Sequence, residues 1–300
     1  MSAPLGTFVA ASLARAVHPA VAAFAEQLGR EAGALGVLFY GSNLRTGSLD
    51  GVLDFYLLLP GPQRERIWPR ISYREQAVEG GVLRAKCATM AWRQFARAAA
   101  GDSRDTTVWT RFAQPSALVW VRDEAARTAI VDAIAQAMRT AAGLAAALGP
   151  EEGGWGDYWR ALFRATYRSE FRVERDGRED AILANDADHF RKLLPLAWDA
   201  AGLQYARQGE GGYRPGLTAA ERARWHRWWS TRRRLGKPLN ILRLVKAAGT
   251  FDGAADYAAW KVARHTGIEL AVTPLRRRHP VLSVPGAAWE LWRRRRAQRM

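Results

Sequence analysis

Residues 36–59 read GVLFYGSNLRTGSLDGVLDFYLLL, and this stretch decides the fold that we expect. Residues 36–40 form a short apolar run that predicts a buried strand, and residues 52–59 form a second such run. The polar residues 46–48 between the two runs predict a turn. The sequence therefore predicts a strand–turn–strand unit in the first part of the chain.

Strand signals continue in the first half of the chain, whereas helical signals dominate the second half. Residues 81–90 and 115–121 predict two further strands, so the first half is expected to be mixed α and β. Four glycines and a proline in residues 208–216 predict a mobile loop or a boundary. Apolar residues at helical spacing predict helices over residues 3–28, 123–148, 158–170, 186–206 and 254–265.

The composition favours a globular protein with phosphate-rich partners. Of the 300 residues 48% are hydrophobic, which is normal for chains that bury a core. Lysine and arginine total 45 against 29 acidic residues, so a net charge of +16 is expected to attract nucleotides, nucleic acid or anionic lipid. The single Cys87 excludes an intrachain disulfide and a site of several thiolates, so any metal is expected to be held by oxygen.

Neither a secretion signal nor a membrane-spanning segment is expected. Residues 3–28 read as a moderately amphipathic helix and lack a basic start followed by an apolar core. No stretch approaches the roughly 20 apolar residues needed to cross a bilayer. We therefore expect a cytoplasmic chain whose contact with a membrane, if it has one, is peripheral.

The turn and the second strand carry residue types that suit phosphate and metal binding. Gly41 lets backbone N–H groups come close to phosphate oxygens, and Ser42 adds a hydroxyl donor without a bulky side chain. Asp54 offers a carboxylate to Mg²⁺, which keeps water and substrate phosphates among its ligands. An acid among apolar residues is costly to bury without a cation, which favours a functional role for Asp54.

Asp50 is a second candidate metal ligand at an unusual spacing. Paired metal carboxylates on a strand normally sit two residues apart, but Val52 and Tyr56 occupy those positions. Asp50 is four residues from Asp54, roughly 13 Å away in an extended strand. It joins the site if Gly51 bends the chain, and otherwise it caps the turn.

Short motifs between residues 40 and 246 occur in the order found in a known family. They are Tyr40-Gly41-Ser42, Leu53-Asp54-Phe55, Lys86, Thr110-Arg111-Phe112-Ala113-Gln114-Pro115, TYRSEFR at residues 166–172, His189-Phe190, and Arg243 with Lys246. Together they resemble the mitochondrial-type CDP-diacylglycerol synthases, the translocator assembly and maintenance family, which are CTP:phosphatidate cytidylyltransferases with a nucleotidyltransferase fold. The sequence departs from the family where Cys87-Ala88 replaces its Tyr-Gly after the lysine and where Gln114 replaces its second lysine.

The resemblance implies a role for each matching residue. The implied catalytic residues are Asp54, Lys86 and Arg111. The implied nucleotide-binding residues are Tyr40, Gly41, Ser42 and Arg172. The implied ligands of Mg²⁺ are Asp54 and Asp50. As alternatives, Lys86 is a solvated lysine at a strand edge, and Arg111 and Arg172 form surface ion pairs.

The implied substrates are CTP and phosphatidate, and the implied products are CDP-diacylglycerol and pyrophosphate. Trp289 and Trp292 beside the arginines at 293–296 predict an end that docks on an anionic membrane, here the inner membrane. A solvated basic tail or a nucleic-acid contact is the alternative for this end. The Trp-rich residues 225–234 fit a lipid-facing surface or a packed core. We do not expect nucleic acid to be the partner, and the sequence leaves the oligomeric state open.

We therefore expect an α+β fold in three parts. A nucleotidyltransferase-like mixed sheet with helices is expected over residues 1–150, a mainly helical domain over 151–235 and a basic amphipathic region over 236–300. Two other functions stay open. The same core can transfer nucleotides to protein, RNA or small molecules. The lack of a second strand carboxylate also fits a non-enzymatic basic membrane-binding or nucleic-acid-binding protein on a decayed transferase scaffold.

Overall fold

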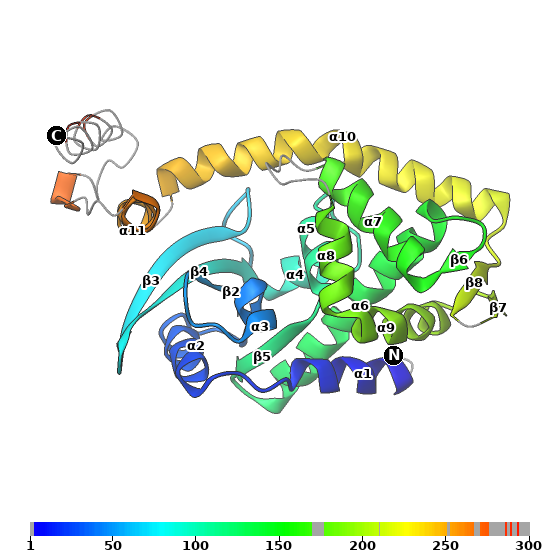
Figure 1. Ribbon diagram of the computed structural model, residues 1–300, viewed down its shortest axis with the longest axis horizontal. Helices are drawn as coiled ribbons and strands as arrows, with labels where there is room; N and C mark the ends of the chain where they lie inside the picture. Colours follow the sequence, from blue (N-terminus) through cyan, green and yellow to red (C-terminus); the bar gives the residue numbers. More distant parts are fainter. Residues whose placement is uncertain are drawn as a thin grey trace.

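The computed structural model describes residues 3–169, 177–209, 211–250, 253–266 and 271–275, together with Gly286, Trp289 and Arg293. Helices pack against a mixed five-stranded sheet, which confirms the expected α+β fold (Figure 1). Arg172 lies outside the described residues, so its predicted role in nucleotide binding stays a prediction. Trp292 and residues 294–296 of the predicted membrane-docking end also lie outside them.

The sheet is built around the strand–turn–strand unit. β1 (Gly36–Tyr40) pairs antiparallel with β2 (Leu53–Leu59) on one side and with β5 (Ser116–Val121) on the other. β4 (Gly81–Ala91) runs parallel to β2, and β3 (Arg70–Val78) pairs antiparallel with β4, which gives the order β3-β4-β2-β1-β5. Alternate residues of β1 and β2 enter two apolar clusters, because both faces of these strands are covered.

β3 is a strand that the sequence pattern did not predict. Its residues read RISYREQAV, and most of them are partly or fully exposed. An edge strand of this kind needs little apolar sequence, because its neighbour β4 supplies the backbone hydrogen bonds. Pairing with a distant segment, rather than local pattern, therefore determines this element.

The single helix expected over residues 3–28 is wrong, because the chain forms α1 (Ala3–Leu13) and α2 (Pro19–Glu31). Pro19 disfavours helical geometry in the preceding residue, and His18 accordingly has a ψ of 136°. The His18 ring caps α2 by accepting a hydrogen bond from the backbone N–H of Ala20.

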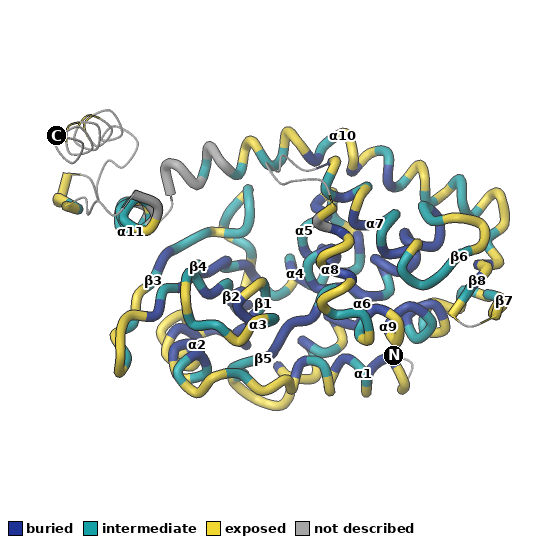
Figure 2. The backbone as a smooth tube through the Cα atoms, in the orientation of Figure 1, coloured by how far each residue is buried: buried dark blue, intermediate teal, exposed yellow. Residues whose placement is uncertain are grey.

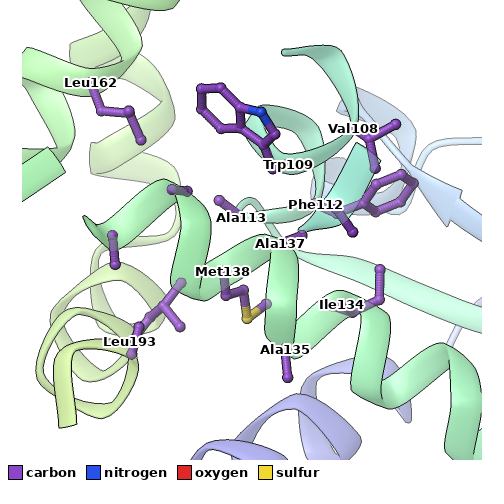
Figure 3. Close-up of a cluster of buried hydrophobic side chains, with 14 of the residues drawn as sticks. Val108, Trp109, Phe112, Ala113, Ile134, Ala135, Ala137, Met138, Leu162 and Leu193 are labelled. Carbon is purple, nitrogen blue, oxygen red and sulfur yellow. The ribbon is translucent and has the colours of Figure 1, made fainter. Parts of the chain in front are cut away.

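Helix α6 (Glu124–Leu148), which the alanine-rich sequence predicts, is the centre of the helical part. The other helices described up to residue 200 are α3 (Ser42–Thr46), α4 (Trp92–Ala99), α5 (Thr107–Phe112), α7 (Trp155–Ser169), α8 (Arg178–Asn185) and α9 (Ala187–Ala200). Small side chains let several of them approach α6 closely. In Figure 3, Met138 and Ala137 of α6 lie among Trp109 and Phe112 of α5 and Leu193 of α9.

The chain after α9 differs from the sequence prediction. The helix expected over 186–206 ends at Ala200, and β7 (Tyr205–Gln208) begins within the range expected to be helical. β8 (Gly212–Pro215) lies in the expected loop 208–216 and pairs with β7. β8 also pairs with the short β6 (Gly153–Gly154), which joins the hairpin to the start of α7. Residues on both sides of a glycine-rich segment can thus form strands when they find partners.

Helix α10 (Ala219–Thr250) runs along one long side of the molecule, from the small sheet to the edge of the large one (Figure 1). Much of its surface is exposed (Figure 2), but Trp229 and Arg232 are buried. Of the two expectations for the Trp-rich residues 225–234, packing in the core therefore holds for Trp229. α10 passes close to α7 at Gly236, where an added methyl group would lie 2.3 Å from the Ser169 carbonyl oxygen. Beyond it, α11 (Ala254–Thr266) packs near β3.

Two further expectations concern the chain as a whole. Within the residues that the structure describes, no helix has the length and apolarity needed to cross a bilayer. The division into parts at residues 150 and 235 stays a prediction. One apolar cluster runs from Leu5 through α6 to Trp229.

Candidate active site

Tyr40, Asp54 and Lys86 lie side by side on three neighbouring strands. Asp54 on β2 is opposite Tyr40 on β1 in the antiparallel pair and opposite Lys86 on β4 in the parallel pair. Residues directly opposite each other on paired strands point to the same face of a sheet. Three of the predicted site residues therefore form one row across the middle of the sheet.

The charge of Asp54 is controlled by burial and by neighbouring cations. Burial raises the pKa of the Asp54 carboxyl, while the positive charges of Lys86, Arg111 and Arg45 act to lower it. Burial also raises the pKa of the Tyr40 hydroxyl, so this group stays neutral and serves as a hydrogen-bonding group. A single carboxylate among three cations gives the site an excess of positive charge, which suits an anionic ligand.

Gly41 brings the backbone directly against the Asp54 carboxylate. Its φ is +91°, in the left-handed region that favours glycine, and an added methyl group would lie 2.9 Å from Asp54 Oδ2. Ser42 follows at the start of α3 and is exposed. The close approach leaves no room for a side chain at residue 41, and it places the Gly41-Ser42 backbone beside the carboxylate.

Asn43 holds the turn between β1 and β2, a role that the sequence pattern did not reveal. Its side-chain amide donates hydrogen bonds to the carbonyl oxygens of Ser48, at 2.9 Å, and Asp50, at 2.7 Å. Asp50 is exposed on this turn, whereas Asp54 is partly buried on the strand. The signal that could have identified Asn43 is an amide inside a short polar turn, where Asn side chains commonly bond to the backbone.

Arg111 on α5 joins the row from above β1. Its guanidinium carbon lies 5.0 Å from the centre of the Tyr40 ring, a cation–π arrangement. The next residue, Phe112, packs edge-on against both Tyr40 and Tyr56 and is fully buried. The buried phenyl ring therefore fixes the helix that carries Arg111 over the strand that carries Tyr40.

A cavity of about 150 Å³ opens beside this row. From the sheet and α5 it is lined by Tyr40, Lys86 and Arg111, and from α10 by Asn240, Arg243 and Lys246, with Pro69, Ile71, Ala88 and Thr107 completing the wall. Among the described residues that line it, four are cationic and none is acidic. The structure thus brings residues as far apart in the sequence as Tyr40 and Lys246 to one pocket that suits phosphate oxygens.

Helix α10 is held over the pocket by ion pairs that are partly buried. Arg243 pairs with Asp105 at 2.7 Å and also donates to the Trp68 carbonyl oxygen, and Lys246 pairs with Glu65. The Asp105 side chain is 2% exposed, so this carboxylate depends on its protein partners for its hydrogen bonds. The same ion pairs that fasten α10 therefore position two of the pocket's cations.

The candidate site is defined by strand register, by the approach of Gly41 to Asp54 and by the residues that line the cavity. The chain matches no known protein-family model and no curated protein sequence. Of the residues expected in the site, Tyr40, Gly41, Asp54, Lys86 and Arg111 come together. Ser42 adjoins them in the chain, and Asp50 lies on the neighbouring turn. The sequence pattern indicated Arg243 and Lys246 by resemblance, but it gave no reason to place Asn240 in the same pocket.

Proposed function

We propose that this chain is a Mg²⁺-dependent nucleotidyltransferase with a nucleotidyltransferase-like core, and that it transfers the cytidylyl group of CTP to phosphatidate. The observation that carries the proposal is the row of Tyr40, Asp54 and Lys86 with Gly41 against the carboxylate. A carboxylate beside a glycine turn, between two residues that line a cationic pocket, would combine a metal ligand with a binding surface for phosphates. The choice of CTP and phosphatidate rests on the motif resemblance.

The donor set around Asp54 fits Mg²⁺ that arrives bound to a nucleotide. Mg²⁺ is commonly held by one or two carboxylates, with water and substrate phosphates as its other ligands. Asp54 supplies one carboxylate, and Asp50 supplies a second if the turn held by Asn43 rearranges. When bound, Mg²⁺ would neutralise charge on the transferring phosphoryl group and orient its oxygens. The nearby cations favour entry of the metal together with a negatively charged triphosphate.

The pocket residues would act by binding and charge neutralisation. The backbone at Gly41 and Ser42 would hold the nucleotide phosphates, and Lys86 and Arg111 would stabilise charge on the transferring group and on pyrophosphate. Asn240, Arg243 and Lys246 line the part of the cavity left for the phosphate of the acceptor. An oxygen of that phosphate would attack the α-phosphorus of CTP, and the bond to the β-phosphate oxygen would break to release pyrophosphate. The attacking oxygen is already anionic and needs no general base.

Pyrophosphate release tests this function directly. The purified chain is assayed with Mg²⁺ and each nucleoside triphosphate in turn, with and without vesicles that contain phosphatidate. Release that requires both CTP and phosphatidate supports the proposal, whereas release without lipid indicates another acceptor. No release under any condition, with nucleotide binding absent as well, would contradict a transferase and favour the decayed scaffold.

A pair of matched variants connects the activity to the site. Asp54→Asn keeps the shape of the side chain but removes the metal-binding charge, and it is expected to lower turnover at least about 100-fold. Asp132→Asn on the exposed side of α6 is the control for loss of one negative charge. Equal turnover of Asp54→Asn and the wild-type chain would refute the site assignment.

The membrane contact is part of the proposal. Described apolar side chains with large exposed fractions include Ile241 and Leu242 at 49%, Leu275 at 68% and Trp289 at 59%. The Arg293 guanidinium carbon lies 5.0 Å from the centre of the Trp289 ring, so a basic and an aromatic group meet at this end. Such pairs suit the headgroup region of an anionic leaflet, and we propose peripheral docking on the cytoplasmic side of the inner membrane.

A further inference from the structure

A second cavity, of about 280 Å³, lies at the other half of α10. Its wall is formed by Gln136, Arg139 and Thr140 of α6, by Arg224, Trp225 and Trp228 of α10, and by Ala100 and Ala201 at the ends of α4 and α9. It shares no lining residue with the cavity beside Asp54. Trp225 and Asn240 are 15 positions apart on one helix, a distance of about 22 Å. The two cavities are therefore separate.

The aromatic wall of this cavity is fixed by close packing. An added methyl group at Gly143 would lie 2.7 Å from Cζ2 of Trp225, and one at Gly101 would lie 2.8 Å from Cζ2 of Trp228. The two indole rings meet edge to face, with centres 5.4 Å apart at an angle of 79°. Both glycines let an indole ring lie directly on the neighbouring backbone. The apolar side of the cavity is thus formed before any ligand arrives.

Arg232 packs against the ring of Trp228 and adds positive charge near the cavity. Its guanidinium carbon lies 3.6 Å from the centre of the Trp228 ring, and its N–H groups donate to the carbonyl oxygens of Gly101 and Trp228. Burial lowers the pKa of Arg232 to about 10, so the group remains charged near neutral pH. These bonds make Arg232 a structural support for the ring rather than a binding group.

The polar side of the cavity is cationic, and one of its N–H groups can donate a further hydrogen bond. Arg139 Nε is buried and has no hydrogen-bond partner within the described part of the chain. A buried N–H of this kind costs free energy unless a water molecule or a ligand accepts from it. No acidic residue lines the cavity in the part of the chain that the structure describes. Glu221, on the same helix, interacts electrostatically with Arg224, and its carboxylate accepts hydrogen bonds from the backbone N–H and the hydroxyl of Thr218.

We propose that this second cavity binds a small organic anion. Its oxyanion head, a phosphate monoester or a carboxylate, would bind to the guanidinium groups of Arg139 and Arg224, which match the geometry of such groups. Its apolar body would lie against Trp225 and Trp228. A cavity with indole walls and a few convergent polar groups is the usual form of a small-molecule site. The volume limits the ligand to about the size of a substituted single ring.

Four small probes test the chemistry on the full chain. Phenyl phosphate and benzoate carry both head and ring, whereas phenol lacks the anion and inorganic phosphate lacks the ring. At least one of the two aromatic anions is expected to bind 10-fold tighter than phenol and inorganic phosphate, measured by titration calorimetry. Whichever of phenyl phosphate and benzoate binds more tightly shows whether the site prefers a phosphate or a carboxylate head group. Failure of both aromatic anions to bind the folded wild-type chain would overturn the proposal.

Variants locate the binding. Arg139→Gln and Arg224→Gln are each expected to weaken binding of the preferred anion about 10-fold, which corresponds to about 1.4 kcal/mol. Ala201→Phe fills the cavity from its exposed rim without removing a polar contact, so it tests the site even if an arginine variant folds poorly. Arg233→Gln is the control, because Arg233 is exposed about 180° around the helix from Arg224. Wild-type affinity in all three cavity variants would overturn the assignment.

The cavity beside Asp54 is also cationic, so a further variant is needed to tell binding there from binding in the second cavity. Lys86→Gln changes that cavity and leaves the second one intact, so it is expected to bind the preferred aromatic anion with wild-type affinity. Loss of binding in Lys86→Gln together with retention in Arg139→Gln would assign the ligand to the pocket beside Asp54 and contradict a second site.

Discussion

Asp54 and Lys86 lie directly opposite each other across the parallel strands β2 and β4. The lysine is the largest of the electrostatic effects that oppose the burial-induced rise in the pKa of Asp54. A buried acid needs a compensating charge to remain ionised, and strand register supplies it here. This pairing makes Lys86 a determinant of the ionised form of Asp54, the form that the proposed metal site requires.

Replacing Lys86 is therefore expected to change how Asp54 titrates. In Lys86→Gln the pKa of the Asp54 carboxyl should rise further, because burial then acts against fewer positive charges. The acid limb of the activity profile should move to higher pH, since in the proposed mechanism only the ionised carboxylate would bind Mg²⁺. Carbon NMR of the carboxyl group measures the pKa. Arg45→Gln, which removes a weaker effect of the same sign, is the control, and an equal shift in both variants would contradict the special role of Lys86.

The glycine next to Asp54 gives a second prediction. Gly41→Ala should unfold more easily than the wild-type chain and lose activity, because it meets both an unfavourable φ and a close contact with Asp54 Oδ2. Each of these effects costs roughly 1 to 3 kcal/mol. Gly61→Ala is the control, since Gly61 has a φ of +80° but open space around it. Urea unfolding and pyrophosphate release are measured for both, and equal losses would show that the close contact with Asp54 does not matter.

The ion pair between Arg243 and Asp105 should carry much of the attachment of α10. Arg243→Gln leaves the buried Asp105 carboxylate without its cation, and loss of one partner of such a pair costs about 3 to 5 kcal/mol in the most buried cases. We expect a lower unfolding midpoint and faster proteolysis within α10. Arg233→Gln, an exposed change on the same helix, should have little effect. Equal stability of the two variants would contradict this role for the pair.

His189 should make the fold sensitive to mild acid. Burial lowers its pKa to about 4, and its ring Nε2 lies 3.0 Å from the Ala113 carbonyl oxygen. The unfolded chain binds a proton near pH 6.5, so stability present above that pH is lost as the pH falls toward 4, by about 2 to 3 kcal/mol. His189→Gln should flatten this dependence in urea unfolding between pH 7.5 and 4.5. His226→Gln on the exposed side of α10 should retain it.

The C-terminal end should matter for lipid surfaces more than for chemistry. Deletion of residues 287–300 removes Trp289 and Arg293, which meet in a cation–π contact. In flotation, a smaller fraction of the truncated chain is expected to bind vesicles that contain phosphatidate. The truncated chain is expected to retain most of its activity on lipid dispersed in detergent. Flotation and pyrophosphate release are measured for both chains. Parallel losses in the two assays would argue against a docking role.

The central part of the fold could be predicted from the sequence because its signals are local. The apolar runs of β1, β2 and β4 and the alanine-rich pattern of α6 each specify an element without reference to the rest of the chain. The break between α1 and α2 was also present in the sequence, as the proline at residue 19, but the amphipathic pattern on both sides concealed it. β3 was missed because a polar edge strand depends on its partner.

By itself, the sequence determined an α+β chain with a glycine turn and an acid on the following strand, because turn chemistry and hydrophobic period act over a few residues. Only the tertiary structure decided which residues surround that acid. The parallel register of β2 and β4 set Lys86 opposite Asp54, and the packing of α10 brought Asn240, Arg243 and Lys246 to the same pocket. Contacts between segments far apart in the chain depend on how whole elements pack, and no local pattern specifies that packing.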